Sequence, residues 1–425
     1  MPEPYDRPAA QPAPPAGPAR GPAASTDSGR APRTASGITP ATSSGGADPA
    51  PAHRSRRGDA HPARRRFPHL GRTAAQPPAD PPRSSDGPPD PAPGVSGAAR
   101  GTVARTRVRR VGEVREWPRS FAERLSAPRP GPGVRDLVRL VRECAVRPPQ
   151  RALADAALLP VAPGPLPQAG PADVAVTWAG HASWVLRIGG LTVLTDPVWS
   201  RRIPGTPARI TPVGVPWDAL PPVDAVAVSH NHYDHLDAPT IRRLPRDTAC
   251  FVPAGLGAWF RRRGFTRVTE LDWWEAAEYR GVRFDFVPAH HWSRRTLTDL
   301  CRSLWGGWVL ADGAGRRVYF AGDTGYGRCF ADIGRAHPGI DLALLPIGAY
   351  APRWMQRTVH TDPEEAVRAF TDLGAAAMAP MHWATFLLSG EPPLEPLLRL
   401  RAAWTAAGLP EHALWDLPVG GSRVL

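Results

Sequence analysis

From residue 174 onward, short apolar runs alternate with polar loops, a pattern that is typical of β-strands. Residues 184–188 and 191–194 flank the pair Gly189-Gly190, which predicts a tight hairpin, and a strand is expected just before it at residues 174–178. Five further runs each lead into a polar or histidine-bearing loop: residues 223–228, 282–287, 318–320, 342–345 and 375–379. The pattern predicts strands whose ends carry the polar chemistry of the protein.

Two segments between and after these strands have helical patterns. Residues 361–365 hold a cap candidate, then Pro363 and two acidic residues, which predicts a helix that starts there and runs to Gly374. A last helix is expected over residues 394–407. Helices that alternate with strands in this way favour an α/β fold.

A third helix is expected at residues 134–146, ahead of the strands. Leu137, Val138, Leu140 and Val141 fall close to one stripe, and arginines occupy the rest. A basic amphipathic helix of this kind can lie on a membrane surface or pack on the folded domain. We favour packing.

The first hundred residues differ in composition from the rest of the 425-residue chain. They hold 22 of the 54 prolines and only two aromatic residues, Tyr5 and Phe67, while all 15 tryptophans lie at Trp117 or beyond. Such a segment cannot bury enough apolar surface to offset its ordering entropy. We therefore expect a disordered leader at residues 1–110, a transitional segment at residues 111–170, and one folded domain at residues 171–425.

The net charge of +13 also belongs mostly to the leader, where 17 arginines face eight acidic residues. Every basic residue is Arg; we interpret the absence of Lys as a bias of the coding sequence. Basic tails can bind nucleic acid or anionic membranes, but we interpret this one as a solvated leader. The folded part is nearly balanced in charge, so no nucleic-acid partner is expected.

Several other classes of protein are disfavoured by what the sequence does not contain. No run of about 18 apolar residues predicts a membrane-spanning helix, and the N-terminus has no apolar core of a secretory signal. The four cysteines are widely spaced, which argues against a disulfide framework or a thiolate zinc site. A cytoplasmic location is expected.

The central chemical feature is the sequence HNHYDH at residues 230–235. It places four ligand-type side chains in six residues after an apolar run: His230, His232, Asp234 and His235. Nitrogen and carboxylate ligands suit zinc and neighbouring first-row metals. The alternative, a solvent-exposed polar loop, is weak for four such residues at this spacing.

Three further candidates follow later strands, namely His291, Asp323 and His382. If the strands run roughly parallel, their following loops meet at one edge of the sheet. A carboxylate shared by two cations lowers their repulsion, so Asp323 is a candidate bridge, and Gly322 before it would allow a close backbone approach.

This series of motifs resembles the metallo-β-lactamase superfamily and, within it, the N-acyl-phosphatidylethanolamine-hydrolysing phospholipase D family. The resembling stretches cover about half the chain: residues 177–182 (TWAGHA), 194–197 (LTDP), 229–237 (SHNHYDHLD), 271–275 (LDWWE), 291–297 (HWSRRTL), 320–326 (FAGDTGY), 346–350 (PIGAY), 360–366 (HTDPEEA) and 382–383 (HW). The six-residue metal motif alone specifies only the superfamily, whereas the ordered series is much more specific.

The resemblance implies a four-layer αβ/βα sandwich with two zinc ions at one edge; other first-row divalent metals remain compatible. By position, the first ion would bind His230, His232 and His291, and the second would bind Asp234, His235 and His382, with Asp323 as the bridge. His290 stands beside His291 and is an alternative ligand, although the family pattern favours His291.

The resemblance also implies a reaction. A metal-bridging hydroxide would attack the phosphodiester of N-acyl-phosphatidylethanolamine and release N-acylethanolamine and phosphatidic acid. Asp234 would accept the proton of the attacking water, and His360 would lie near the phosphate or the leaving group. Mammalian members carry Gln before that histidine, and here the residue is Val359, which bears on specificity.

A phospholipid substrate makes peripheral contact with the inner face of a membrane compatible with this interpretation, and the resemblance also allows a homodimer. The alternatives are hydrolysis of a lactone or a small soluble phosphoester on the same fold and, more distantly, nucleic-acid processing. Several residues are less clear. Asp196 would either orient a ligand histidine through a hydrogen bond or form a turn. His181 fits a buried core histidine slightly better than a residue that supports a metal ligand. Arg294 and Arg295 fit structural arginines better than residues that bind an anionic head group.

Overall fold

The structure, a computed structural model, describes residues 106–126, 133–143, 150–170 and 172–425. The described residues belong to one compact unit, Pro93–Leu425. The predicted leader lies outside the described residues up to residue 105. Residues 106–110, the end of the predicted leader, are described and include β1 (Arg107–Arg109). This strand pairs with a later strand, so paired structure begins before residue 110.

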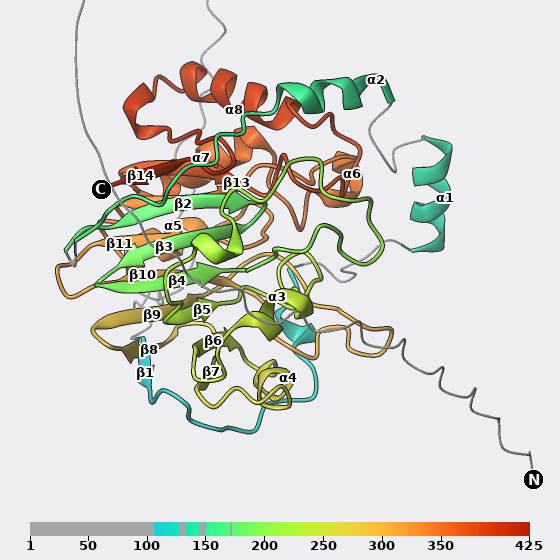
Figure 1. Cartoon of the computed structure of the whole chain (residues 1–425). Helices are drawn as coiled ribbons and strands as arrows, with labels where there is room; N and C mark the ends of the chain where they lie inside the picture. Colours follow the sequence, from blue (N-terminus) through green and yellow to red (C-terminus); the bar gives the residue numbers. More distant parts are fainter. Residues whose placement is uncertain (1–105, 127–132, 144–149, 171) are drawn as a thin grey trace, which may run out of the picture. The chain divides into compact units, whose positions relative to one another are not determined.

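Two seven-stranded mixed sheets build the domain (Figure 1). The first sheet has the order β14-β2-β3-β4-β5-β6-β7, with β2 (Ala175–Gly180), β3 (Ser183–Ile188), β4 (Leu191–Thr195), β5 (Ala225–Ala227), β6 (Ala249–Pro253), β7 (Val268–Leu271) and β14 (Ser422–Val424). The second has the order β1-β8-β9-β10-β11-β12-β13, with β8 (Glu275–Tyr279), β9 (Val282–Val287), β10 (Gly307–Ala311), β11 (Arg317–Phe320), β12 (Leu342–Pro346) and β13 (Ala377–Met381).

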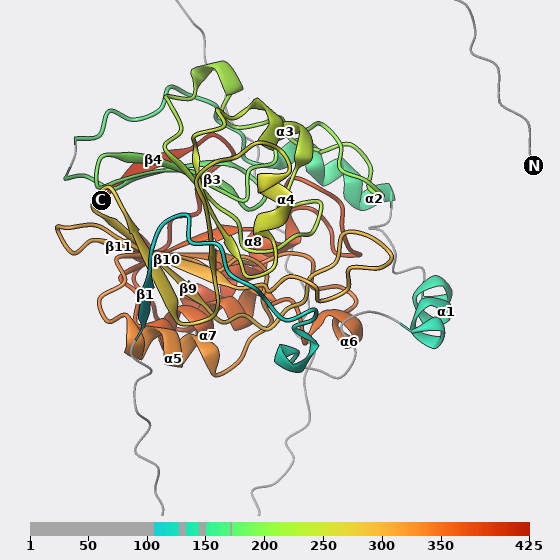
Figure 2. The same cartoon turned by 90° about the horizontal axis from the view of Figure 1, so that it is seen from below.

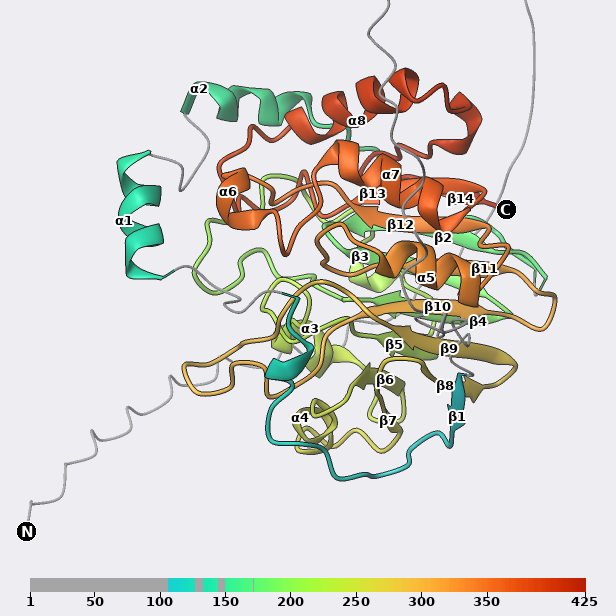
Figure 3. The same ribbon diagram turned by 180° about the vertical axis from the view of Figure 1, so that it is seen from behind.

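Helices cover the outer faces of the two sheets. The helices are α1 (Val134–Arg142), α2 (Gln150–Leu153), α3 (Ala238–Arg243), α4 (Gly257–Arg261), α5 (Cys329–Ala336), α6 (Arg353–Gln356), α7 (Pro363–Leu373) and α8 (Glu395–Ala406). Figure 2 shows the strands between α3 on one side and α5 and α7 on the other. From behind, α5 and α7 lie over the second sheet and α8 lies beside α7 (Figure 3).

The inner faces of the two sheets form the main hydrophobic core. Phe251 of β6 stacks on Phe284 of β9 with ring centroids 3.8 Å apart, and Trp308 of β10 packs against Phe286 at 4.7 Å. Trp308 also reaches the other sheet, because its indole N–H donates to the carbonyl of Val228. The predicted four-layer αβ/βα sandwich is therefore confirmed.

The sheet topology explains why the polar loops meet. In the first sheet β4, β5 and β6 run parallel, and in the second β11, β12 and β13 run parallel. β9 is antiparallel to β10, which is antiparallel to β11, so β9 and β11 point the same way. The loops after these strands consequently open at one edge, where ligands of such sheets collect.

Most of the predicted elements are present. The hairpin of β3 and β4 turns at Gly189 and Gly190, both with positive φ, and β9 has the predicted bounds. α7 starts one residue after its cap, Asp362, and ends before Gly374, which adopts φ +62°. Local signals were sufficient for these elements because turns and caps depend on a few neighbouring residues.

The helix expected at residues 134–146 was predicted to pack on the folded domain, and this prediction of its packing was wrong. α1 forms, but Leu137 and Val138 are each 47% exposed and none of its residues is buried. It touches the domain at Trp354 on α6, whose ring lies 4.2 Å from Arg139 and whose indole N–H donates to the C-cap residue Glu143 at 2.8 Å. Among the residues that the structure describes, no helix is both long and apolar enough to cross a membrane.

Candidate metal centre

The loop after β5 is irregular, and Asp196, which follows β4, fixes it at two points. The Oδ1 atom of Asp196 accepts a hydrogen bond from the backbone N–H of Ser229 at 2.7 Å. Its Oδ2 atom lies 2.6 Å from Nδ1 of His235. A carboxylate on Nδ1 orients a ligand histidine so that Nε2 faces the site. Asp196 thus takes the orienting position that the sequence left open.

The first group of converging side chains contains His230, His232, His291 and Asp323. His230 Nε2 lies 2.9 Å from His232 Nδ1, which lies 3.3 Å from His291 Nε2. Asp323 Oδ2 lies 3.9 Å from His230 Nε2 and 3.7 Å from His291 Nε2. The four atoms surround one point between the two sheets.

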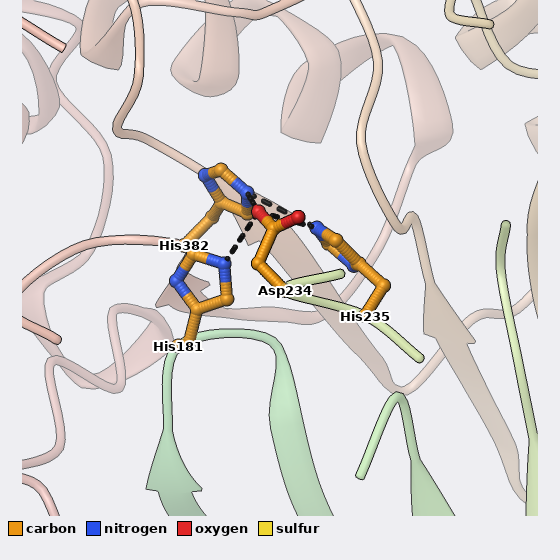
Figure 4. A group of neighbouring side chains, drawn as sticks. All are labelled: His181, Asp234, His235 and His382. Carbon is orange, nitrogen blue, oxygen red and sulfur yellow. Dashed lines mark hydrogen bonds and ion pairs between the residues drawn. The ribbon is translucent and has the colours of Figure 1, made fainter. Parts of the chain in front are cut away.

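The second group contains Asp234, His235, His382 and His181, which are drawn in Figure 4, and the carboxylate of Asp323 lies against it. Asp234 Oδ2 is 3.4 Å from His235 Nε2 and 3.5 Å from His382 Nε2, and these two nitrogens are 3.2 Å apart. Asp323 contributes Oδ2 at 3.2 Å from His235 Nε2 and Oδ1 at 3.0 Å from His382 Nε2. The carboxylate of Asp323 therefore belongs to the first group and also contacts the second.

These distances fit divalent metal ions. Atoms that bind a tetrahedral metal at about 2.0–2.1 Å are about 3.3–3.4 Å from one another. The contacts between donors span 2.9–3.9 Å in the first group and 3.0–3.5 Å in the second. Both groups offer imidazole nitrogen and carboxylate oxygen, which are ligands of zinc and similar metals. All seven residues predicted as ligands are present in the two groups.

The electrostatics of the two groups keep their carboxylates charged. Burial raises the pKa of Asp323, but the neighbouring His235 and His382 outweigh burial and hold the pKa well below its usual range. Burial also lowers the pKa of His382, but Asp323 and Asp234 outweigh it and raise the pKa to about 9. In the first group burial prevails, and the pKa of His232 falls to about 3.

A glycine next to the shared carboxylate lets the two sheets approach each other. Gly322 has φ +61°, and a Cβ atom built on it would lie 2.5 Å from Cβ of Ser229. Ser229 directly precedes His230, so the loops that carry the ligands touch at this point. The predicted close backbone approach at Gly322 is confirmed.

An open pocket of about 430 Å³ borders the two groups of ligands. Its apolar wall includes Ile203, Trp292, Leu297 and Leu388, and its polar wall includes His232, Tyr233, Asp234, Arg294, Arg295 and Thr296. Trp292 packs edge-on against His232 with ring centroids 4.6 Å apart. The pocket gives access to the metal-binding side chains from outside the sandwich.

Comparison with known proteins identifies the fold family. The family model described as "Beta-lactamase superfamily domain" matches residues 192–383, a range that contains all seven candidate ligands. A solved structure described as a possible metal-dependent hydrolase from Veillonella parvula aligns with a TM-score of 0.51 at 18% identity, over 59% of this chain and 99% of that one. The chain belongs to the metallo-β-lactamase superfamily.

Relatives within the superfamily include metal-dependent hydrolases. An uncharacterized protein of Mycobacterium tuberculosis is 43% identical over 61% of this chain and 73% of its own length. The N-acyl-phosphatidylethanolamine-hydrolyzing phospholipase D 1 of Caenorhabditis elegans is 38% identical over 49% of this chain and 64% of its own length. A metal-dependent hydrolase of Nitratidesulfovibrio vulgaris is 31% identical over 50% and 80%, respectively. This superfamily member is a metal-dependent hydrolase.

The structure distinguishes the two adjacent histidines that follow β9. His291 presents Nε2 to the first group, while its Nδ1 lies 3.0 Å from the carbonyl of Val359. His290 points elsewhere and packs on Gly327, and it belongs to neither group of ligands. Val359 therefore contacts a candidate ligand through its backbone, whatever its side chain.

His360, predicted as a catalytic residue, lies beside the shared carboxylate. Its Nδ1 is buried 4.0 Å from Oδ2 of Asp323 and has no hydrogen-bond partner among the described residues. Arg353 fixes its backbone by donating to the carbonyl of His360 at 2.7 Å. Burial lowers the pKa of His360 well below its usual value, so the ring is neutral at pH 7.

Two residues that the sequence interpretation undervalued contact the site. His181 follows β2, and its Nε2 lies 3.1 Å from Oδ2 of Asp234 (Figure 4). Arg295 donates from Nη1 to the carbonyls of Asn231 and Leu236, at 3.1 and 2.6 Å. Both lie in stretches that carried the family resemblance, but only the fold shows what each one touches.

Proposed function

We propose that this chain is a zinc-dependent phosphodiesterase of the phospholipase D type. Its substrate would be N-acyl-phosphatidylethanolamine, and its products N-acylethanolamine and phosphatidic acid. The observation that carries the proposal is the pair of ligand groups that both contact the carboxylate of Asp323 and border an open pocket. The choice of substrate is supported by the 38% identical relative from Caenorhabditis elegans, of which the match covers 64%.

The seven candidate ligands divide into two sets in this proposal. His230, His232 and His291 would hold one zinc ion, and Asp234, His235 and His382 would hold the other. Asp323 would bind both, since its two oxygens reach both groups. A pair of such ions, when bound, lowers the pKa of bound water and polarises a phosphoryl oxygen.

The chain itself would orient the substrate and move the proton. Oδ2 of Asp234 faces three histidines, while no hydrogen bond to its Oδ1 is present among the described residues. Asp234 also lines the pocket, so this second oxygen can accept the proton of the attacking water. The neutral ring of His360 can donate one N–H hydrogen bond to an oxygen of the phosphate or of the leaving group.

The pocket wall suits an amphiphilic substrate. Ile203, Leu297 and Leu388 offer apolar surface, and Leu297 is 88% exposed at the rim. Arg295 lies on the same wall, and the charge of its guanidinium complements a phosphate. This combination fits a phosphodiester that carries acyl chains better than a small, uniformly polar ester.

The test combines metal analysis with identification of the products. The purified protein should hold about two equivalents of zinc and convert N-acyl-phosphatidylethanolamine to N-acylethanolamine and phosphatidic acid. His291→Ala should lose metal and slow the reaction by more than about 100-fold, since a bound metal contributes several kcal/mol to catalysis. His290→Ala is the matched control, because this neighbouring histidine belongs to neither group; it should keep both metal and activity.

Three outcomes would contradict the proposal. A folded protein without bound metal after purification in zinc would remove the catalytic centre. Hydrolysis of soluble phosphodiesters or lactones, with none of the lipid, would assign the site to a different substrate class. Equal losses in His290→Ala and His291→Ala would contradict the assigned ligand.

A further inference from the structure

His181 occupies a fixed position beside the second group of ligands. It is 1% exposed, follows β2 and adopts φ +56°, a conformation that few residues other than glycine take up. Its backbone N–H donates to Oγ1 of Thr385 at 2.7 Å, and its carbonyl accepts from the indole of Trp178 and the N–H of His382. The His181 backbone is thus tied directly to a candidate ligand.

The ring of His181 packs among the second group of ligands (Figure 4). Its centroid lies 4.1 Å from the ring of His382, and Phe386 covers it edge-on at 5.4 Å. Its only polar contact among the described residues is Nε2 with Oδ2 of Asp234 at 3.1 Å, and Nδ1 has no partner there. Because this nitrogen faces a carboxylate oxygen, a hydrogen bond between the two places the proton on Nε2.

We propose that His181 is a positioning residue that holds Asp234 for metal binding by donating a hydrogen bond from Nε2 to Oδ2. It would not itself be a ligand. The inference rests on the proposed metal centre. By holding Asp234 in place, His181 would raise the affinity of the second site for its metal ion above the affinity that the seven ligands alone would give.

The physical reason is the freedom of a carboxylate on a loop. Asp234 lies in the irregular segment after β5, where no helix or strand restricts its side chain. A neutral donor at 3.1 Å, fixed at its own backbone by three hydrogen bonds, restricts the carboxylate to one orientation before metal arrives. Removing such a partner of a metal ligand typically costs 10- to 100-fold in metal affinity.

The test compares two substitutions of equal backbone strain. His181→Gln keeps an N–H donor close to the position of Nε2, while His181→Leu removes it. Titration with zinc against a chelator should show two sites in the natural protein. His181→Leu should weaken the second site by about 10- to 100-fold and leave the first unchanged, and His181→Gln should restore most of the affinity. Circular dichroism before and after metal loading identifies a variant that fails to fold.

A second measurement uses the natural protein and does not depend on either variant folding. Histidine ¹⁵N spectra of the zinc-loaded protein should show His181 with a proton on Nε2 and no metal on either nitrogen. A metal-bound His181 ring, equal losses in the folded Gln and Leu variants, or unchanged affinity in His181→Leu would each overturn the inference. If the natural protein binds no metal at all, the proposed function fails first, so the two failures are distinguishable.

Discussion

Arg295 joins the two loops that supply the first group of ligands. It lies four residues after His291, and its guanidinium bridges the carbonyls of Asn231 and Leu236, which flank His232, Asp234 and His235 in the other loop. The guanidinium of Arg295 also stacks on Tyr233, with its central carbon, Cζ, 4.1 Å from the ring centroid. Burial lowers the pKa of Arg295, but an arginine keeps its charge at any physiological pH. This side chain holds the metal-binding loop in place.

We predict that Arg295→Met lowers the free energy of unfolding by about 1–3 kcal/mol, because two backbone carbonyls lose their donor. It should also weaken binding of the first metal. Arg295→Lys should be intermediate, since one donor remains but the planar stacking is lost. Urea denaturation with and without zinc measures both effects.

Arg294→Met provides the control for Arg295→Met. Arg294 is exposed, and its one hydrogen bond among the described residues runs to the carbonyl of Thr296. Its replacement should change stability by no more than about 0.5 kcal/mol. Equal effects of the two substitutions would show that charge at the pocket, and not the contact with the loop, accounts for the result.

At the scale of single elements, α7 shows how local signals position a distant site. Asp362 caps the helix by accepting from the backbone N–H of Glu365 at 2.8 Å, and Glu365 returns a contact to the backbone N–H of Asp362. This capping box lies two residues after His360. The start of the helix therefore fixes the loop that presents His360 to Asp323.

Asp362→Ala should reduce the free energy of unfolding by about 1 kcal/mol, the usual cost of losing an N-cap. It should also lower turnover, because the loop before the helix loses its anchor. Asp362→Asn keeps the accepting oxygen and should retain most of the stability, although its contact with Arg353 loses charge. Thermal unfolding of the metal-loaded variants measures the difference; an Ala variant as stable as the natural protein would contradict the role of the cap.

At the scale of the whole molecule, the candidate centre joins the two halves of the sandwich. The first sheet supplies Asp196 and the loop at residues 228–237, and the second supplies His291, Asp323 and His382. Before a metal ion binds, the second group should hold protons, since the pKa of His382 is raised to about 9 and that of His235 is raised well above its usual value. A metal ion must displace these protons to bind.

Metal affinity should therefore fall as the pH is lowered below about 9, by up to about tenfold per pH unit for each proton displaced. The sign follows from the raised pKa: below it the ring is protonated, and the proton competes with the metal. Zinc titrations at several pH values, with the chelator calibrated at each, test this dependence. An affinity that does not change between pH 6 and pH 9 would contradict it. Bound metal should also raise the unfolding temperature, since it binds only the folded state.

The sequence alone was informative wherever the signal is local. Turns, caps and alternating apolar residues predicted the β3–β4 hairpin, β9, α7 and α8, because each depends on residues close together in the chain. The motif series also named the seven side chains that the fold brings together. Their roles as ligands, like those of Asp234 and His360 in catalysis, stay predictions until metal and activity are measured.

Only the tertiary structure decided which polar atoms face one another. His290 and His291 are indistinguishable as residue types, but the position of the chain after β9 turns one toward Asp323 and packs the other on Gly327. The contacts of His181 with Asp234, and of Arg295 with Asn231, join residues 53 and 64 positions apart. Likewise, the sequence could not predict that the apolar stripe of α1 is exposed. An apolar stripe shows that a helix can bury one face, but it does not show whether another part of the protein covers that face. Contacts over such separations depend on how two sheets pack, which no local pattern encodes.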